Sequence, residues 1–212
     1  MPSGQTIALF MIAALALNLT PGPSILFILS SCMAQGRRAG VVSVFGLSTA
    51  ALVHAIAVAF GLSALFVYSP LAFAAVKYCG AAYLVYLGIR GFMAGGIAGL
   101  AARAERRPAV PLSRIYWQGV LTDLLNPKVL LFFFSFLPQF VDPARGSPSR
   151  QMLILGLLFQ VTALPTNLGV AFAGGSLAQF IARSPFWGRV QTWFSSAVLL
   201  GLGLRLAFSQ RR

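Results

Sequence analysis

Six long apolar segments dominate this chain of 212 residues. A helix of about 20 apolar residues is long enough to cross the hydrocarbon core of a bilayer. With approximate boundaries, the segments cover residues 5–34, 40–67, 70–94, 114–141, 151–177 and 190–208. Only 9% of the residues are charged, whereas about a quarter are charged in a soluble domain. The sequence therefore predicts an all-α integral membrane protein with six transmembrane helices.

Two of these segments are interrupted by proline. The first contains Thr20, Pro21, Gly22 and Pro23, and the fourth contains the sequence Asn-Pro-Lys at 126–128. Proline removes a backbone donor and clashes with the preceding turn, so each interruption should break its helix. Thr and Asn favour the N-cap and proline the first helical position, so each break should begin a new half-helix. The alternative is that these prolines only kink long helices.

The two breaks occupy corresponding places in the two halves of the chain. We expect one membrane domain over 1–212, built from a three-helix repeat at 1–94, a basic cytoplasmic linker at 95–113 and a second repeat at 114–212. Three crossings per half force the halves into opposite orientations, which is the inverted-repeat arrangement of many secondary transporters. The first helix of each repeat would then be broken near the membrane midplane.

The arginines predict the orientation. Cytoplasmic loops of membrane proteins carry an excess of Lys and Arg, which favours an arrangement with both termini outside. The arginines that would face the cytoplasm are Arg37, Arg38, Arg103, Arg106, Arg107, Arg114, Arg183 and Arg189. The net charge of +13 is therefore explained by topology, and we expect no nucleic-acid partner.

Ionisable groups inside the apolar segments are few. Asp123 precedes the second break, Lys128 follows it, and His54 lies near the middle of the second segment. Charged groups at membrane depth are costly and are usually functional, so Asp123 and His54 are candidates for proton coupling. The alternatives are a structural ion pair between Asp123 and Lys128, and a purely structural histidine. A further polar cluster in the fifth segment could bind a small solute; it comprises Gln160, Thr162, Pro165, Thr166 and Asn167.

No enzyme, metal or cofactor site is expected. The chain has one histidine, three acidic residues and two cysteines, and it lacks a phosphate-binding GxxxxGK[ST] motif. Cys32 and Cys79 do not have the spacing of metal ligands, so we expect both to be inert packing residues.

Three motifs carry a family resemblance. TPGPSILFILSSCMAQGRRAG begins at Thr20, KYCGAAYLVYLGIRG at Lys77 and LLNPKVLLFFFSFLPQFV at Leu124. In order and position they resemble the LysE/RhtB family of amino-acid exporters. The resemblance implies a bacterial inner-membrane exporter of amino acids or related metabolites, driven by proton antiport. The small residues of the second motif, Gly80, Ala81 and Gly88, also predict close helix packing.

The expected substrate is a neutral amino acid, such as threonine, homoserine or leucine. Helix N-termini attract anions, so both breaks should receive the carboxylate, while Asp123 or His54 lies near the ammonium group. The residues expected to bind substrate are Thr20, Pro21, Gly22, Pro23, Ser24, Asn126, Pro127, Lys128 and Asn167. Further expected partners are the proton, membrane lipid and, as one option, a second copy of the chain. The alternatives are a non-transporting or lipid-binding membrane subunit and a channel.

Overall fold

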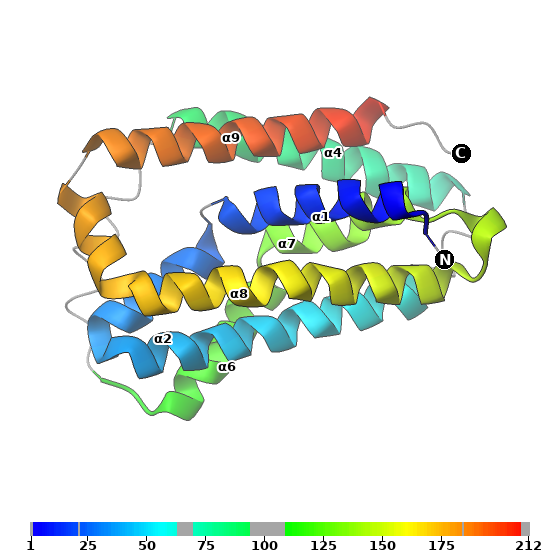
Figure 1. Ribbon diagram of the computed structural model, residues 1–212. Helices are drawn as coiled ribbons and strands as arrows, with labels where there is room; N and C mark the ends of the chain where they lie inside the picture. The colour runs from blue at the N-terminus through cyan, green and yellow to red at the C-terminus, as the bar shows by residue number, and fades with distance from the viewer. Residues whose placement is uncertain (1, 21, 63–69, 94–108, 184, 209–212) are drawn as a thin grey trace.

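The computed structural model describes residues 2–20, 22–62, 70–93, 109–183 and 185–208. Within these ranges the regular structure is entirely helical (Figure 1). The longer helices are α1 (Gly4–Leu19), α2 (Pro23–Ala57), α4 (Pro70–Met93), α6 (Leu112–Leu124), α8 (Pro148–Arg183) and α9 (Pro185–Phe208). The short ones are η1 (Val58–Leu62), α7 (Pro127–Leu131), η2 (Phe132–Phe136), η3 (Leu137–Phe140) and η4 (Pro143–Arg145).

The first apolar segment is broken, as predicted, but its caps differ from the prediction. Thr20 is the C-cap of α1, and Gly22, in extended backbone, is the N-cap of α2. The Thr20 hydroxyl donates to the carbonyl oxygen of Ala16 at 2.7 Å, so it bonds to the helix behind it. The expectation that Thr20 is an N-cap is therefore wrong, and Pro23 occupies the first position of α2. Pro21 lies outside the described residues.

A turn inside α2 separates the first and second apolar segments. Gln35 has φ −142° and ψ 15°, and Gly36 has φ +80°, so neither residue is helical. A φ of +80° lies in the left-handed region, which glycine enters without the penalty that a side chain would bring. This turn lies between the predicted segments 5–34 and 40–67, next to Arg37 and Arg38.

The fourth apolar segment is broken at the predicted place. The side-chain oxygen of Asn126 accepts a hydrogen bond from the Lys128 backbone N–H at 3.1 Å, and Pro127 begins α7. The helices on either side of this break are bent by 48°. Asn126 is thus the N-cap that the sequence predicted. Beyond α7 the chain passes through a π-helical turn, η2, and a 3₁₀ turn, η3.

The helices pack as pairs. α2 lies against α8 and α6, and α4 lies against α9 (Figure 1). A Cβ atom on Gly88 of α4 would lie 2.9 Å from the carbonyl oxygen of Ser196 on α9. A Cβ on Gly203 would lie 3.0 Å from the carbonyl oxygen of Ala81. The predicted close packing at Gly80, Ala81 and Gly88 is confirmed, because these backbones approach more closely than a larger residue allows.

Aromatic rings fill the centre of the core. Phe132 and Phe133 of η2 are 1% and 0% exposed. The Phe159 ring centroid lies 5.1 Å from that of Phe132 and 5.0 Å from that of Phe133, which joins η2 to α8. Phe10 of α1 packs on the other side of Phe132 at 5.7 Å. This core holds α1, η2 and α8 together next to the two breaks.

The described helices fit a membrane protein by length and composition. Two ranges, Pro23–Gly61 and Pro148–Gly174, are long and apolar enough to cross a bilayer. A third qualifies if the bent pair Leu112–Leu124 and Pro127–Phe140 counts as one span. Large apolar side chains also stand on the outside, among them Ile12 at 67% exposed, which suits a surface covered by lipid.

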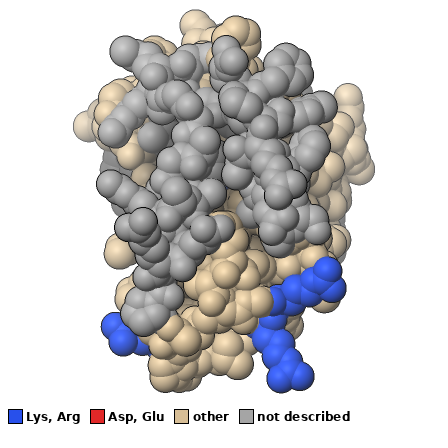
Figure 2. Space-filling view, turned by 90° about the vertical axis from the view of Figure 1, so that its left-hand side faces the viewer, with Lys and Arg blue, Asp and Glu red and all other residues tan. Residues whose placement is uncertain are grey.

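The two ends of the bundle differ in charge. The start of α1 and the end of α9 lie at one end, and the Gln35–Gly36 turn lies at the other (Figure 1). Figure 2 views this second end, where the visible blue side chains gather low on the face and no red is seen among the described residues. Arg37, Arg38 and Arg114 are all exposed.

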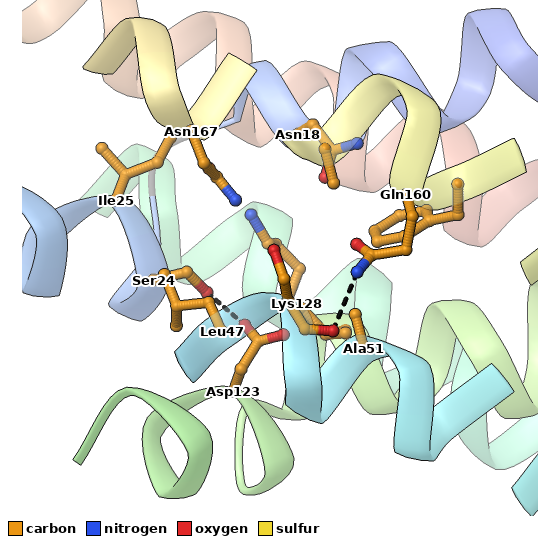
Figure 3. A pocket seen from close by; sticks show the side chains of 13 residues that line it. Asn18, Ser24, Ile25, Leu47, Ala51, Asp123, Lys128, Gln160 and Asn167 are labelled. Atoms are coloured by element: carbon orange, nitrogen blue, oxygen red, sulfur yellow. Dashed lines mark hydrogen bonds between the residues drawn. The ribbon is translucent and has the colours of Figure 1, made fainter. Parts of the chain in front are cut away.

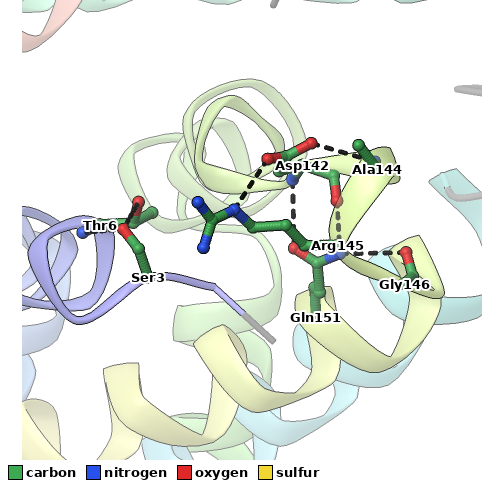
Figure 4. Close-up of polar contacts among 7 residues, drawn as sticks. All are labelled: Ser3, Thr6, Asp142, Ala144, Arg145, Gly146 and Gln151. Atoms are coloured by element: carbon green, nitrogen blue, oxygen red, sulfur yellow. Dashed lines mark hydrogen bonds and ion pairs between the residues drawn. The ribbon is translucent and has the colours of Figure 1, made fainter.

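A polar cluster closes the opposite end (Figure 4). Asp142 and Arg145 form an exposed ion pair at 3.1 Å. The buried Gln151 side chain donates to the carbonyl oxygens of Asp142 at 2.8 Å and Gly146 at 3.1 Å. Gln151 thereby ties the loop to the start of α8.

Candidate functional site

The two helix breaks meet beside a small polar cavity (Figure 3). Its walls come from α1, α2, α6, α7 and α8. The residues that line it are Asn18, Ser24, Ile25, Leu47, Ser48, Ala51, Asp123, Lys128, Val129, Phe159, Gln160, Ala163 and Asn167. Polar groups from both halves of the chain therefore face the same space.

A chain of hydrogen bonds connects the first break to the second. The Ser24 hydroxyl donates to Oδ1 of Asp123 at 2.6 Å, and it accepts from the side-chain amide of Asn126 at 2.8 Å. Ser24, Asp123 and Asn126 are 8%, 5% and 1% exposed. Because the serine oxygen already accepts from Asn126, its one proton is free for the carboxylate. Asp123 is thus held as an acceptor at the cavity wall.

Lys128 ties the second break to the end of α1. Its Nζ donates to the carbonyl oxygens of Thr20 at 2.8 Å and Leu17 at 3.2 Å. A Cβ on Gly22 would lie only 3.3 Å from the same Nζ, so the absence of a side chain there leaves room for the ammonium group. The carbonyls at the C-terminal end of a helix carry partial negative charge, which makes them suitable acceptors for a cation; that of Leu17 also accepts from the Thr20 backbone N–H at 3.1 Å.

The structural ion pair between Asp123 and Lys128, which was the alternative interpretation, is not formed. The ammonium group bonds to the backbone of α1, while the carboxylate bonds to Ser24. Both charged groups still line the one cavity. The two charges are therefore held apart, each by neutral partners.

His54 lies behind this site and does not line the cavity. Its Nε2 lies 3.3 Å from the backbone carbonyl oxygen of Asp123, which can only accept. The imidazole ring stacks on Phe133, with ring centroids 5.6 Å apart. These contacts support the structural alternative for His54, because it touches the backbone of Asp123 and not its carboxylate.

The fifth apolar segment brings amide groups to the cavity from α8. Gln160 and Asn167 line the cavity, and Asn167 points toward Lys128 (Figure 3). Thr162 and Thr166 instead donate to carbonyl oxygens of their own helix, at 2.8 Å and 2.7 Å. Pro165 is exposed. The predicted polar cluster is thus divided, with two members at the cavity and three elsewhere.

Comparison with known proteins identifies the family. The model of the LysE type translocator family matches residues 15–210. This chain belongs to that family. The resemblance seen in the sequence motifs is therefore confirmed, and membership of a translocator family agrees with the expectation of a transporter instead of an enzyme.

Several curated relatives of this translocator are similar over most of their length. A homoserine/homoserine lactone efflux protein of Salmonella typhimurium is 33% identical, over 82% of this chain and 80% of the relative. An uncharacterized membrane protein of Pseudomonas aeruginosa is 32% identical, over 89% and 88%. A leucine efflux protein of Salmonella choleraesuis is 25% identical, over 95% and 94%. No solved structure matches the chain.

Several residues predicted to bind substrate in this translocator support the site without lining it. Thr20 and Gly22 contact Lys128, and Asn126 contacts Ser24. Pro23 is exposed, and Pro127 serves to begin α7. These residues shape the two breaks, while Ser24, Asp123, Lys128 and Asn167 present their side chains to the cavity.

Sequence reasoning missed two polar residues of the cavity. Asn18, near the end of α1, donates to Thr162 at 2.9 Å, and Ser48 lies on α2 opposite Gln160. Both are polar residues inside apolar segments, which is the signal that could have found them. Serine is also common at helix contacts in membranes, so its presence alone is a weak signal.

The cavity of this translocator is too small for its proposed solute. Its volume is about 20 Å³, which holds one water molecule and no amino acid. Binding a solute therefore requires the walls to move apart. Since the contacts across the cavity are side-chain hydrogen bonds between separate helices, they can exchange for bonds to a ligand without unwinding a helix.

Proposed function

We propose that this translocator exports neutral amino acids in exchange for protons. The observation that carries the proposal is the cavity at the two breaks, where Asp123 and Lys128 face the same space without pairing. An amino-acid zwitterion carries one charge of each sign. Its ammonium group suits Asp123 and its carboxylate suits Lys128, so the bound pair would be neutral as a whole.

Charge balance supports a neutral side chain. A buried charge is costly unless it is paired, and among the described residues that line the cavity Asp123 is the single acid and Lys128 the single cation. A lysine or arginine substrate would add a positive charge without a matching carboxylate. The relatives' names agree, because homoserine and leucine both have uncharged side chains.

The same carboxylate offers a route to proton coupling. Asp123 accepts a hydrogen bond from Ser24, and it can hold either a proton or the substrate ammonium group at the cavity. Competition of two positively charged species for one carboxylate produces exchange, which is the requirement for antiport. The expectation that His54 takes part in proton transfer gains no support from its contacts, because it bonds to the backbone carbonyl of Asp123 and not to the carboxylate.

We also propose the six-span inverted repeat, with halves at 1–94 and 114–212 joined by the linker at 95–113, in the inner membrane with both termini outside. Three features support it. The first helix of each half is broken, corresponding helices pair as α2 with α8 and α4 with α9, and the exposed Arg37, Arg38 and Arg114 mark one end as cytoplasmic.

Efflux measurements test this function. Cells loaded with a panel of amino acids are compared for wild type, Asp123→Asn, Lys128→Met and the exposed control Arg145→Ala. We expect the first two variants to lose efflux of neutral amino acids and the control to retain it, with a protonophore abolishing uphill export.

Unchanged efflux in Asp123→Asn and Lys128→Met would refute the proposal and favour a non-transporting subunit. Gradient-following flux that ignores the proton gradient would refute antiport and favour a channel. Export of arginine but of no neutral amino acid would refute the substrate preference.

A further inference from the structure

Two polar atoms beside the cavity are buried and have no hydrogen-bond partner. They are the hydroxyl oxygen of Ser48 on α2 and the amide oxygen of Gln160 on α8. Both residues line the cavity. Buried polar atoms without a partner are rare in proteins and costly, so two of them at one cavity require an explanation.

The orientation of the Gln160 amide follows from its neighbour. The amide nitrogen donates to the backbone carbonyl oxygen of Ser48 at 2.8 Å. A carbonyl oxygen can only accept, so the nitrogen must face it and the amide oxygen is the free atom. Together with the Ser48 hydroxyl, the pair offers one acceptor and one group that can donate or accept. Such a pair is matched by a ligand hydroxyl.

The charged ends of a zwitterion are already accounted for elsewhere in the cavity. Under the proposed function, on which this inference rests, the carboxylate goes to Lys128 and the ammonium group to Asp123. Gln160 and Asn167 approach Lys128 from different sides (Figure 3). Because Gln160 and Ser48 are neutral, they compete poorly with Asp123 for an ammonium group. Gln160 and Ser48 are therefore available to bind the side chain of the substrate.

Apolar side chains lie beside this pair in the cavity wall. Leu47, Ala51 and Phe159 also line the cavity, and Phe159 is 2% exposed. Apolar walls accept a short carbon chain, and among the residues that line the cavity Ser48 and Gln160 are the ones with a buried polar atom that lacks a hydrogen-bond partner. A substrate with a methyl group in place of its hydroxyl would leave both buried atoms unpaired.

We propose that Ser48 and Gln160 form a specificity subsite that receives the side-chain hydroxyl of the substrate. The translocator would then prefer hydroxylated neutral amino acids, such as homoserine and threonine, over aliphatic analogues of the same size. A site built to bond a hydroxyl group rejects the analogue that lacks it, and one unpaired group corresponds to about a tenfold preference or more.

The test compares two substrates of equal size. Homoserine and norvaline differ only in a terminal hydroxyl or methyl group, and their efflux rates are measured in wild type, Ser48→Ala and Gln160→Met. We expect wild type to favour homoserine by about tenfold, and each variant to reduce this ratio toward one, mainly by slowing homoserine. Thr166→Val is the matched control, because its hydroxyl lies on α8 but bonds to its own helix.

The outcomes separate this inference from the proposed function. Efflux of both substrates by wild type at equal rates would overturn the subsite while leaving amino-acid export intact. A preference for homoserine that persists in Ser48→Ala would also overturn the subsite. Because Ser48→Ala removes a single oxygen atom, it provides the decisive measurement if Gln160→Met does not accumulate. Failure of wild type to export either amino acid would instead refute the proposed function.

Discussion

Ser24 provides the sharpest test of the contact between the two breaks. It is the only residue described here that bonds to both Asp123 and Asn126, which it does at 2.6 Å and 2.8 Å. Ser24→Ala removes both hydrogen bonds and adds nothing in their place. The carboxylate oxygen and the amide nitrogen would then lie buried without these partners.

The expected loss of stability follows from these two bonds. A hydrogen bond to a charged group contributes about 1.5–3 kcal/mol and one between neutral groups about 1 kcal/mol. Ser24→Ala should therefore lower the free energy of unfolding by roughly 2–4 kcal/mol. Ser31→Ala is a matched control on the same helix. Ser31 is also buried, but its hydroxyl donates to the carbonyl oxygen of Phe27 within α2, and losing such a bond should change stability by less than about 0.5 kcal/mol.

The measurement is unfolding of the purified protein by SDS titration in mixed micelles. The reasoning would be refuted if Ser24→Ala and Ser31→Ala had the same unfolding free energy within error. A second test compares the double variant Ser24→Ala/Asp123→Asn with the two single variants. Residues that share a hydrogen bond should have non-additive effects on the free energy of unfolding. A loss in the double variant equal to the sum of the two single losses would therefore also refute the reasoning.

Three further substitutions test other parts of the fold in the same unfolding assay. Gly88→Val should cost about 1–3 kcal/mol, because a Cβ there lies 2.9 Å from the carbonyl oxygen of Ser196; a neutral result would contradict the close contact of α4 and α9. Gly36→Ala should lower the free energy of unfolding by about 1 kcal/mol, because Gly36 has a φ of +80° in the left-handed region. An alanine variant of unchanged stability would contradict this turn. Arg145→Ala should cost less than about 1 kcal/mol, since its pair with Asp142 is exposed; a larger loss would show that the loop depends on it.

The sequence predicted both the position and the N-cap of the second break, but only the position of the first. The reason is the local chemistry of the capping residues. Asn126 directly precedes Pro127, and its short side chain reaches the Lys128 N–H two residues on. At the first break a threonine hydroxyl has two choices, and it bonds back to Ala16. Gly22 then acts as the N-cap with no side chain at all, which no side-chain preference could have indicated.

For the charged residues, too, the sequence indicates which residues matter, while their partners depend on the fold. Asp123 could be selected from the sequence because acids are rare in apolar segments. Its partner could not, because the nearest cation in sequence, Lys128, bonds to the end of α1 instead. Likewise, Gln160 is visible in the sequence as a polar residue, but its free oxygen is apparent only once Ser48 is known to face it.

The bond from Lys128 to the end of α1 has a consequence for how the chain enters a membrane. Leu17 and Thr20 precede Lys128 by 111 and 108 residues. During synthesis, the carbonyl groups at the first break are therefore made long before the ammonium group that completes them. Until the fourth apolar segment arrives, these carbonyl oxygens lack their bonds to the Lys128 ammonium group, although that of Leu17 still accepts from the Thr20 backbone N–H. The bonds that tie the end of α1 to α7 can therefore form only after the fourth apolar segment has been made.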